Sequence, residues 1–521
     1  MEGFRVQADR TARLLQATPG WQAVQAILPD YDSETVEAIL REAAAFAETE
    51  LAPLNVVSDQ QGCRIVDGRV RTPAGFAQAY RRYAEAGWLG MDLPEAHGGQ
   101  GLPLTLQAAC LPLFERGCVS MMMAAGSSRA ACHLLAAVAE PALAEEWIGQ
   151  LLAGEWTATI CISEPDAGSD VGRIRTTAAQ GSDGLWQING VKSWISFGDH
   201  DLAARIGHCL LARTGKKAGT AGLSLFLVPN QIDGKANGIA VQRIEEKMGL
   251  HGSPTCILGF DGARGWLLGE EGRGLNALFH MIELMRLQTG CQGLGLASAS
   301  ADIAETYAQD RKQGGPADRP PLPIAQHPDV RRQLSLLRRQ TEVTRAAILE
   351  SAARMDLARL SADEAERAQM RDFSAFMLPM IKTFGAEAGF DVSNRAIQVM
   401  GAAGYTKEWP VEQHLRDSRV MTIYEGTTGI QAIDFLTRRL WRDQGRGLAV
   451  FERLMREGIA TASANHPAKA AEAEAALAAF LAMAEELNGL QSDPEAALYR
   501  AEDYMRCAWA AVTAWMALRL D

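Results

Sequence analysis

The segment from Val420 to Gln431 carries the residue best suited to acid–base chemistry. Glu425 stands there between an apolar run and a Gly-Thr-Thr-Gly turn that precedes a predicted helix. A carboxylate held among apolar groups has its pKa raised toward neutrality, which suits a general base. A structural interpretation also exists, because the helix dipole favours a carboxylate near a helix N-terminus. We therefore treat Glu425 as the candidate base.

Two further segments differ from ordinary core or loop. Residues 160–170 (ICISEPDAGSD) pass from a predicted strand into a turn rich in hydroxyl groups and backbone donors. Such a turn can bind a polar heterocycle or a phosphate, but the pattern also describes a plain strand-to-loop transition. In the stretch 193–196 (SWIS), Trp194 and Ser196 should share one face of a strand. An indole and a hydroxyl suit a flat ring that needs stacking and one hydrogen bond, although a core tryptophan is the common alternative.

Several common catalytic sites are missing from the sequence. It has no GxSxG elbow, no Walker A loop and no HExxH motif, and none of its nine histidines has a metal-ligand partner at helical spacing. We therefore predict no metal site. The Gly-Leu-Gly at 293–295 follows no predicted strand and lacks the third glycine of a dinucleotide-binding fingerprint. We interpret it as a close helix-packing contact, which disfavours a nicotinamide enzyme.

The elements that must position these residues are helices on either side of a β region. From 32 to about 156, apolar residues recur at three- and four-residue spacing, which predicts helices. Short β-branched and aromatic runs then predict a small antiparallel sheet, with Asn189-Gly190 as a type I′ hairpin turn. Helices return over 275–312, 329–360 and 374–400. The last one carries a predicted buried stripe made of Phe376, Met380, Phe384, Ala388, Val392, Ala396 and Met400.

These patterns predict a mostly α fold with a small β domain and four parts. We expect an N-terminal helical domain at 1–156, a central β domain at 157–269 and a C-terminal helical bundle at 270–440. Beyond them, the Ala-rich residues 441–521 predict an appended region of two or three amphipathic helices.

Composition narrows the class of protein. The 521 residues are 47% apolar and 22% charged, so the chain can bury a large core and is too long for a small binding module. Its formal charge is 51 − 63 = −12, which disfavours nucleic acid and anionic lipid as main partners. The nine cysteines are scattered and never in CxxC spacing, which indicates reduced thiols. With no secretory signal pattern and no long uninterrupted apolar stretch, we expect a cytoplasmic protein without a membrane span.

Taken together and in this order, the motifs resemble the acyl-CoA dehydrogenase family over about residues 35–440. The matching motifs are SEPDAGSD, SWIS, MIELMR, AQDRK, IQVMGAAGY and IYEGTTGIQ. The chain length, with CRIVDGRVRTPAGF, QHPDVRR and GIQAIDFLTRRL, resembles a long subgroup that includes methylmercaptopropionyl-CoA dehydrogenase and carries a helical C-terminal extension. The resemblance implies a central antiparallel β-barrel or sandwich and a C-terminal four-helix bundle.

The resemblance also implies a reaction, namely the FAD-dependent dehydrogenation of an acyl-CoA in fatty acid β-oxidation. Glu425 would remove the α-proton of the thioester while the β-carbon delivers hydride to flavin N5, giving a trans-2-enoyl-CoA. The backbone N–H of Glu425 and a ribityl hydroxyl of FAD would hold the thioester oxygen, as an oxyanion hole does. Some relatives place the base at the position of Met285, and methionine leaves that role to Glu425.

Cofactor and substrate contacts are implied residue by residue. The residues expected to bind FAD are Ile162, Ser163, Ser169, Trp194, Ser196, Arg311, Gln398, Gly401, Thr427 and Gly429. Of these, Arg311 and the turn from Gln398 to Ala402 would reach the FAD of a neighbouring subunit. The residues expected to contact the substrate are Ser169, Glu283, Arg286 and Gly426. Ala402 replaces the second glycine usual in the family, and the loop after Lys312 is longer than in short relatives.

The resemblance further implies an electron-transfer flavoprotein as electron acceptor and a homodimer or homotetramer. Two alternatives share the fold: a DNA-associated alkylation-response flavoprotein, and an acyl-CoA desulfinase whose flavin the substrate would not reduce. The first would need a basic C-terminal surface, but residues from Trp441 onward have a net charge of 8 − 12 = −4. The acyl group stays open, because the Met, Ala and Ser residues between Ser120 and His133 suit either a deep pocket or close helix contact.

Overall fold

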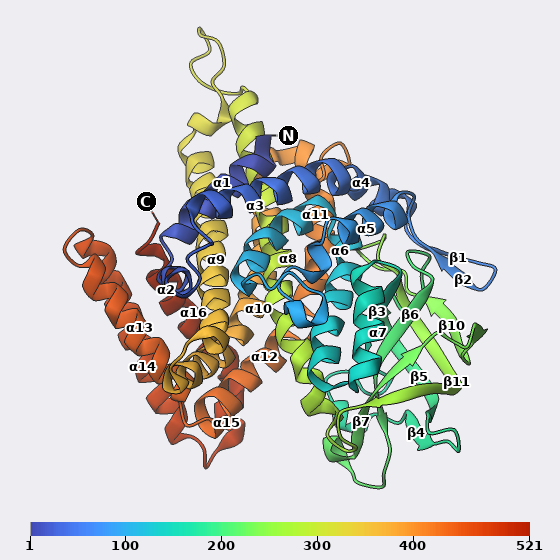
Figure 1. Cartoon of the computed structure of the whole chain (residues 1–521). Helices are drawn as coiled ribbons and strands as arrows, with labels where there is room; N and C mark the ends of the chain where they lie inside the picture. The colour runs from blue at the N-terminus through green and yellow to red at the C-terminus, as the bar shows by residue number, and fades with distance from the viewer. Residues whose placement is uncertain (1, 521) are drawn as a thin grey trace. The chain divides into compact units, whose positions relative to one another are not determined.

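The computed structural model describes residues 2–520, and these form two compact units. Unit 1 contains the chain up to Ala47, Pro103–Arg116 and the chain from Arg286 onward, whereas unit 2 contains Glu48–Leu102 and Gly117–Met285. Two long helices, α6 (Leu104–Val138) and α8 (Gly274–Asp310), contribute a segment to each unit. Both are labelled in Figure 1.

Unit 2 is built around a seven-stranded mixed sheet. Its strands are β3 (Trp156–Cys161), β4 (Thr177–Gln180), β5 (Trp186–Ser196), β6 (Arg205–Arg213), β7 (Leu223–Pro229), β10 (Ile239–Ile244) and β11 (Thr255–Leu268). Pairing runs from β11 through β5, β4, β6 and β7 and back to β11, so these five strands close a barrel. Most pairs are antiparallel, as expected, but β6 lies parallel to β3 and β4. The predicted small β domain is therefore present, with a mixed rather than a purely antiparallel sheet.

The hairpin turn predicted at Asn189-Gly190 is wrong. Both residues lie inside β5, where Asn189 pairs with β4 and Gly190 with β11. Glycine is needed there for close approach, because a Cβ on Gly190 would lie 2.4 Å from the hydroxyl of Thr176. A type I′ turn instead joins β1 (Arg64–Val66) to β2 (Arg69–Arg71) at Asp67-Gly68, where both residues have positive φ.

Helices complete unit 2. They are α4 (Ala52–Gln61), α5 (Phe76–Glu85), the second part of α6, α7 (Pro141–Leu152) and the first part of α8. Trp147 of α7 is fully buried and packs against Trp156 at a ring distance of 4.6 Å, which seats α7 on the sheet. By length and hydropathy alone α6 could cross a membrane, but 94% of its apolar window is buried inside the protein.

The bundle of unit 1 consists of three long helices and two short ones. They are the second part of α8, α9 (Pro328–Leu360), α10 (Glu364–Met400), α11 (Val411–Arg419) and α12 (Thr428–Asp434). The predicted stripe on α10 is confirmed, because all seven of its residues are buried. This helix begins ten residues before the predicted start, since the Asp363 carboxylate accepts the Ala365 N–H and caps it. The helix-packing interpretation of 293–295 is confirmed too: a Cβ on Gly293 would lie 1.9 Å from the Gly385 carbonyl.

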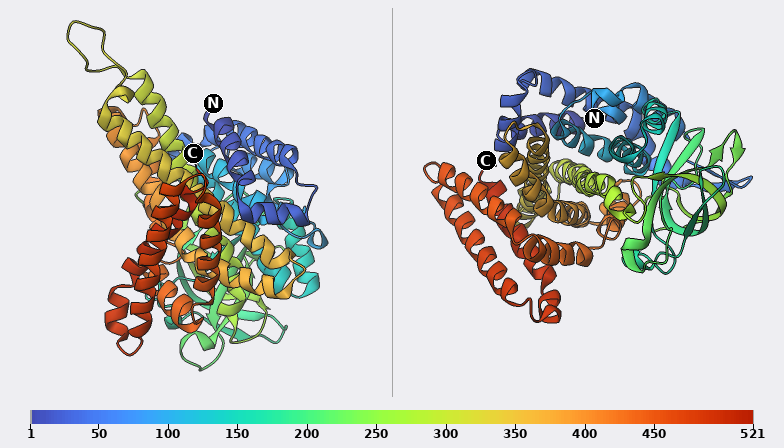
Figure 2. Two further views of the ribbon diagram at one scale, coloured as in Figure 1. Left: turned by 90° about the vertical axis from the view of Figure 1, so that its left-hand side faces the viewer. Right: turned by 60° about the horizontal axis from the view of Figure 1, so that its bottom comes forward.

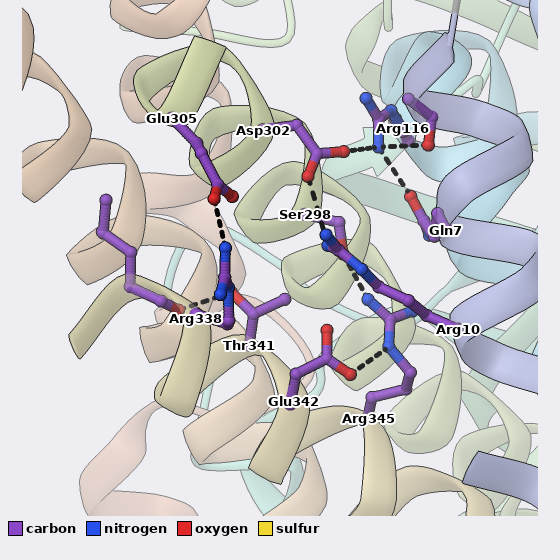
Figure 3. A network of polar contacts seen from close by, with 12 residues as sticks. Gln7, Arg10, Arg116, Ser298, Asp302, Glu305, Arg338, Thr341, Glu342 and Arg345 are labelled. Atoms are coloured by element: carbon purple, nitrogen blue, oxygen red, sulfur yellow. Dashed lines mark hydrogen bonds and ion pairs between the residues drawn. The ribbon is translucent and has the colours of Figure 1, made fainter. Parts of the chain in front are cut away.

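The N-terminal helices of unit 1 are held by a polar network. These helices are α1 (Glu2–Gln16), α2 (Pro19–Ile27) and α3 (Ser33–Phe46). Figure 3 shows Asp302 of α8 between Arg10 and Arg116, with side-chain distances of 3.5 and 2.5 Å, and Arg345 of α9. Arg345 donates to Thr11 and Ser298, each at 3.1 Å, so α1 is fixed to both α8 and α9.

Residues beyond the bundle form four more helices in unit 1. They are α13 (Arg446–Ala462), α14 (Pro467–Gly489), the short α15 (Pro494–Tyr499) and α16 (Ala501–Ala517), drawn in orange to red in Figure 2. Aromatic rings from these helices pack on the bundle, with Phe451 and Phe376 5.4 Å apart and Tyr504 and Phe435 5.0 Å apart. Arg519 also pairs with the buried Glu350 of α9 at 2.7 Å. The extension is thus packed against the bundle as part of the same unit.

Candidate active site

Glu425 lies in a turn of unit 1 with an unusual backbone. The turn follows the 3₁₀ segment Val420–Thr422 and precedes α12, and Glu425 and Gly426 have φ angles of 53° and 87°. Glycine adopts such values freely, whereas a residue with a Cβ is strained there by about 1–2 kcal/mol. Thr427 then caps α12 by accepting the Ile430 N–H at 3.3 Å. Left-handed backbone outside glycine is a feature of functional sites, and Glu425 has it.

Both carbonyl groups of this turn are held by side chains. Gln431 donates its amide to the Glu425 carbonyl oxygen at 2.8 Å, and the Lys382 ammonium group donates to the Gly426 carbonyl oxygen at 2.7 Å. Gln431 comes from α12 and Lys382 from α10, and both residues are buried. The turn is therefore fixed from two helices.

The carboxyl group of Glu425 has two opposing influences on its protonation. Removal of the half-buried carboxylate from water raises its pKa, and the nearby charges of Lys382 and Arg286 lower it in part. Lys382 is 0% exposed, and desolvation lowers the pKa of its amine to about 8, against the opposing effect of Glu425. This arrangement supplies a carboxylate of raised basicity, as proton abstraction requires.

Arg286 is held by a carboxylate in the same region. Its guanidinium group pairs with Asp434 at 2.9 Å, and Arg438 and Arg439 lie 3.2 and 4.0 Å from the other oxygen of Asp434. The Nε–H of Arg286 is buried and has no hydrogen bond among residues 2–520. One donor of this predicted substrate contact is therefore left for a ligand. We name Glu425 and its neighbours the Glu425 cluster; it consists of Arg286, Lys382, Glu425, Gly426, Gln431 and Asp434.

A second buried carboxyl group lies near this cluster. Tyr424 donates its hydroxyl to Gln292, and Gln288 of the same helix donates to Glu115 at 3.3 Å. Glu115 is fully buried, and desolvation raises its pKa well above the usual range despite hydrogen bonds from the two glutamines. Burial likewise raises the pKa of Tyr424 well above its ordinary value. Burial therefore favours the protonated form of the Glu115 carboxyl group.

The other predicted segments meet in unit 2. Trp194 has a φ angle of 63°, and its side chain is 62% exposed, whereas Ser193 and Ile195 are buried. The Ser193 N–H donates to the Ser163 carbonyl oxygen at 2.9 Å, which joins β5 to the loop after β3. We define the Trp194 face by five residues: Ile162, Ser163, Ser169, Trp194 and Ser196. The interpretation of Trp194 as a core residue is thereby wrong, because its ring lies at the surface of unit 2.

The polar groups of the Trp194 face differ from those beneath it. Within residues 2–520, the hydroxyls of Ser163, Ser169 and Ser196 make no hydrogen bond. Beneath them, the fully buried Lys192 donates to the Ile162 carbonyl oxygen at 2.8 Å and pairs with Glu164 at 2.9 Å. Glu164 also accepts two backbone N–H groups, at 2.7 and 3.0 Å. The face is thus rigidly supported while its outward groups stay open to a ligand.

The remaining residues predicted to bind cofactor or substrate lie next to Glu425 in the chain or in other parts of the structure. Gly426, Thr427 and Gly429 adjoin Glu425 in the chain, whereas Glu283 is an exposed residue in the unit 2 segment of α8. Arg311 follows the end of α8, and the loop between α8 and α9 extends away from the helices in Figure 2. Gln398 and Gly401 lie at the end of α10, and Gln398 is sixteen residues, or about 24 Å along a helix, from Lys382. Within one chain these three residues are not brought to the Glu425 cluster.

The sequence interpretation missed several residues of these sites. They are Lys382, Gln431, Asp434 and Lys192, whose contacts stabilise the two sites. Lys382 gave a usable signal, since it is an isolated cation within the apolar run FMLPMIKTFGA of α10. A lysine in a buried helical stripe needs a partner, because an unpaired buried charge is costly. Among the described residues, no group of three or more His, Cys, Asp or Glu side chains could hold a metal ion.

Comparisons with known proteins agree along most of the chain. Three family descriptions match in order: the acyl-CoA dehydrogenase N-terminal domain over residues 33–155, its middle domain over 159–263, and its C-terminal domain over 272–440. The 3-methylmercaptopropionyl-CoA dehydrogenase of Ruegeria pomeroyi is 36% identical over 438 residues, which cover 82% of this chain and 74% of the relative.

Solved structures show the same fold over nearly the whole chain. Caenorhabditis elegans ACDH-11 in complex with C11-CoA has a TM-score of 0.81 at 20% identity, and the match covers 96% of this chain and 86% of that one. The acyl-CoA dehydrogenase from Bacillus anthracis complexed with FAD has a TM-score of 0.74 at 22% identity, with coverages of 94% and 82%. Both matches extend beyond residue 440, so the helical extension has counterparts in solved proteins.

Proposed function

Because the chain belongs to the acyl-CoA dehydrogenase family of FAD-dependent oxidoreductases, we propose that it dehydrogenates an acyl-CoA thioester between the α and β carbons, giving a trans-2-enoyl-CoA. The observation that carries this proposal is the Glu425 turn, with its left-handed backbone, half-buried carboxyl group and raised pKa. These are the properties of a base that removes a weakly acidic proton.

In this proposal each group of the Glu425 cluster has a role. Glu425 takes the α-proton on its carboxylate, and its backbone N–H donates to the thioester oxygen, where negative charge develops. The charges of Lys382 and Arg286 favour the ionised form of the carboxyl group, against the larger effect of burial. The free Nε–H of Arg286 donates to the substrate, and Ser169, Glu283 and Gly426 make its further contacts. When bound, FAD supplies the oxidant that accepts the hydride equivalent from the β-carbon.

The residues of the Trp194 face fit such a cofactor. An exposed indole held in a strained conformation, together with serine hydroxyls that make no hydrogen bond among residues 2–520, suits a flat heteroaromatic ring with polar edges. We assign the five residues of this face to FAD, together with Thr427 and Gly429. Arg311, Gln398 and Gly401 are assigned to the FAD of a neighbouring subunit in a homodimer or homotetramer.

The proposal extends to the partner and the compartment. We propose an electron-transfer flavoprotein as the acceptor that reoxidises the enzyme. All nine cysteines are free thiols, and all but Cys63 and Cys507 are buried, which supports a reducing compartment such as the cytoplasm.

An anaerobic reduction experiment tests the proposal. The purified yellow holoenzyme, mixed with a panel of acyl-CoA thioesters without oxygen, should bleach with at least one of them. Glu425→Gln should keep its FAD and reduce it at least about 100-fold more slowly, because the general base is lost. Glu408→Gln, at an exposed carboxylate outside the cluster, is the matched control and should bleach as the wild type does. Undiminished bleaching by Glu425→Gln would sink the mechanism.

The bleaching experiment separates the desulfinase alternative, and a DNA-binding assay separates the other. A desulfinase would turn over its substrate without flavin bleaching. A DNA-associated role is disfavoured because arginines of the extension are already paired: Arg446 with Asp372, Arg456 with Glu474 and Arg500 with Glu486. A gel shift at moderate salt that showed tight DNA binding would favour that role instead.

A further inference from the structure

Lys382 places a charged side chain in the buried middle of α10, where burial of an ammonium group is unfavourable. Its neighbours on the helix include the apolar stripe, and its side chain is fully buried. Taking an ammonium group out of water is unfavourable unless hydrogen bonds and opposite charge compensate it. The hydrogen bond is to the Gly426 carbonyl oxygen at 2.7 Å, and the opposite charge is that of Glu425. Both compensations therefore lie in one turn, next to the proposed base.

The turn at Glu425 needs contacts with other elements to stabilise its backbone conformation. Glu425 has a φ angle of 53°, which strains a residue with a Cβ, so the conformation persists only where its surroundings impose it. The carbonyl oxygen of Glu425 accepts a hydrogen bond from Gln431, and the carbonyl oxygen of Gly426 accepts one from Lys382. Gln431 belongs to the helix that directly follows the turn. Lys382 is the donor that ties the turn to a distant element.

We propose that Lys382 is the positioning residue of the Glu425 site: its ammonium group holds the Gly426 carbonyl so that Glu425 keeps its left-handed backbone, and its positive charge favours the ionised form of the Glu425 carboxyl group. This inference rests on the proposed role of Glu425 as the base. It gives the lysine two separable tasks, a mechanical one through a hydrogen bond and an electrostatic one through charge.

The charged groups around Lys382 and Glu425 decide in which direction the loss of Lys382 would shift the protonation of Glu425. Arg286 adds positive charge from α8, but Asp434 pairs with it at 2.9 Å and offsets part of its field. Glu387, farther along α10, favours the charged lysine, and Arg506 of the extension pairs with that carboxylate at 2.9 Å. Of the two cations that lower the pKa of the Glu425 carboxyl group, Lys382 has the larger effect and Arg286 the smaller. Removal of Lys382 should therefore make the carboxyl group easier to protonate.

Three substitutions of Lys382 separate the two tasks. Lys382→Met removes the donor and the charge, Lys382→Gln keeps a donor but removes the charge, and Lys382→Arg keeps both. Thr383→Val is the matched control, because Thr383 is the buried neighbour on the same helix and its hydroxyl has no hydrogen bond among the described residues. Each holoenzyme is measured for the rate of flavin reduction as a function of pH, and for backbone hydrogen exchange over residues 423–431.

The proposal predicts a distinct pattern across these variants. Lys382→Met and Lys382→Gln should both move the acidic limb of the rate profile upward by about one pH unit, since an opposite charge beside the carboxylate is lost. Hydrogen exchange in the turn should accelerate in Lys382→Met but not in Lys382→Gln. Lys382→Arg should restore both readouts, and Thr383→Val should change neither.

The outcomes distinguish this inference from the proposed function. A wild-type profile in Lys382→Met or Lys382→Gln, with unchanged exchange in Lys382→Met, overturns the role of Lys382 even if the enzyme is an acyl-CoA dehydrogenase. Should Lys382→Met fail to fold, Lys382→Gln alone still tests the charge. If no acyl-CoA reduces the wild-type flavin, the proposed function fails, and the exchange measurement still decides whether Lys382 holds the turn.

Discussion

The Glu425 cluster of unit 1 and the Trp194 face of unit 2 share one feature and differ in another. Both contain a non-glycine residue in the left-handed region, with φ angles of 53° at Glu425 and 63° at Trp194. In the Glu425 cluster, however, carbonyls and charges are met by Lys382, Gln431 and Asp434. On the Trp194 face, an exposed ring and three serine hydroxyls have no protein partner in the described part of the chain.

The difference indicates that the two regions suit different tasks, proton abstraction in the Glu425 cluster and ligand binding on the Trp194 face. A group that must abstract a proton works best in a fixed polar environment that needs no rearrangement during the reaction. A surface that receives a large ligand can leave its outward groups open, provided that the backbone beneath them is rigid. The Trp194 face has that support in the buried Lys192–Glu164 pair. Substitutions in the cluster should therefore change the chemistry, whereas substitutions in the face should change cofactor retention.

The largest effect should come from breaking the support of the Trp194 face. Lys192→Met leaves the Glu164 carboxylate buried without its cation, which should lower the free energy of unfolding by about 3–5 kcal/mol. The double variant Lys192→Met/Glu164→Gln should recover much of this loss, because no unpaired charge remains. Urea unfolding of the wild type, Lys192→Met, Glu164→Gln and the double variant measures the coupling. Equal losses in the single and double variants would show that the pair does not act as a unit.

The second largest effect is the pH dependence of stability that Lys382 of the Glu425 cluster should cause. The pKa of Lys382 falls from 10.5 to about 8 on folding, so between these values the unfolded chain binds more protons than the folded one. The free energy of unfolding therefore rises with pH in this window. Below pH 8 the buried lysine lowers it by its full contribution, which is about 3 kcal/mol for a pKa difference of 2.5 units. Lys382→Met lacks this contribution. The wild-type minus variant difference in unfolding free energy should therefore rise by that amount between pH 8 and pH 10.5, and a flat difference would contradict it.

These two lysines also mark what sequence patterns could not reveal. The helical regions, the stripe on α10, the close contact at Gly293 and the β region were predictable, because each depends on local periodicity or on residue size. The order of the motifs alone also indicates the family. The partners of Lys382 and Lys192 depend on which carbonyl or carboxylate the fold brings near, and local patterns carry no such information.

The turns show the same limit at short range. Asn189-Gly190 and Asp67-Gly68 both have the dipeptide type that favours a type I′ turn. The turn forms at Asp67-Gly68, which is flanked by two three-residue strands. At Asn189-Gly190 the strand continues, because neighbouring strands pair on both sides and Gly190 lies against Thr176. Tertiary pairing thus overrides a local preference where a strand is central.

A smaller effect tests how tightly the Glu425 turn is constrained. Gly426→Ala should lower the free energy of unfolding by about 1–2 kcal/mol, because φ is 87° and the new Cβ would lie 2.9 Å from the Gln431 amide nitrogen. Flavin reduction should slow in the same variant while FAD is retained. For stability, Gly429→Ala is the comparison, since its Cβ would meet no atom closer than 3.9 Å. Urea unfolding of the two variants should separate them, and equal stabilities would mean that the turn relaxes freely.

The smallest effect should appear at Trp194 and should have the opposite sign. Trp194→Asn should raise the free energy of unfolding by about 0.5–1 kcal/mol, because asparagine tolerates the left-handed region and the replaced ring is largely exposed. The same variant should lose FAD on dilution, since the stacking surface is removed. Trp194→Phe keeps an aromatic ring and the strain, so it should retain both the cofactor and wild-type stability. Thermal unfolding of the FAD-free proteins and flavin fluorescence after dilution provide the two readouts. If Trp194→Asn gains stability and keeps its FAD, the strain at Trp194 serves no ligand, and the contrast with Glu425 fails there.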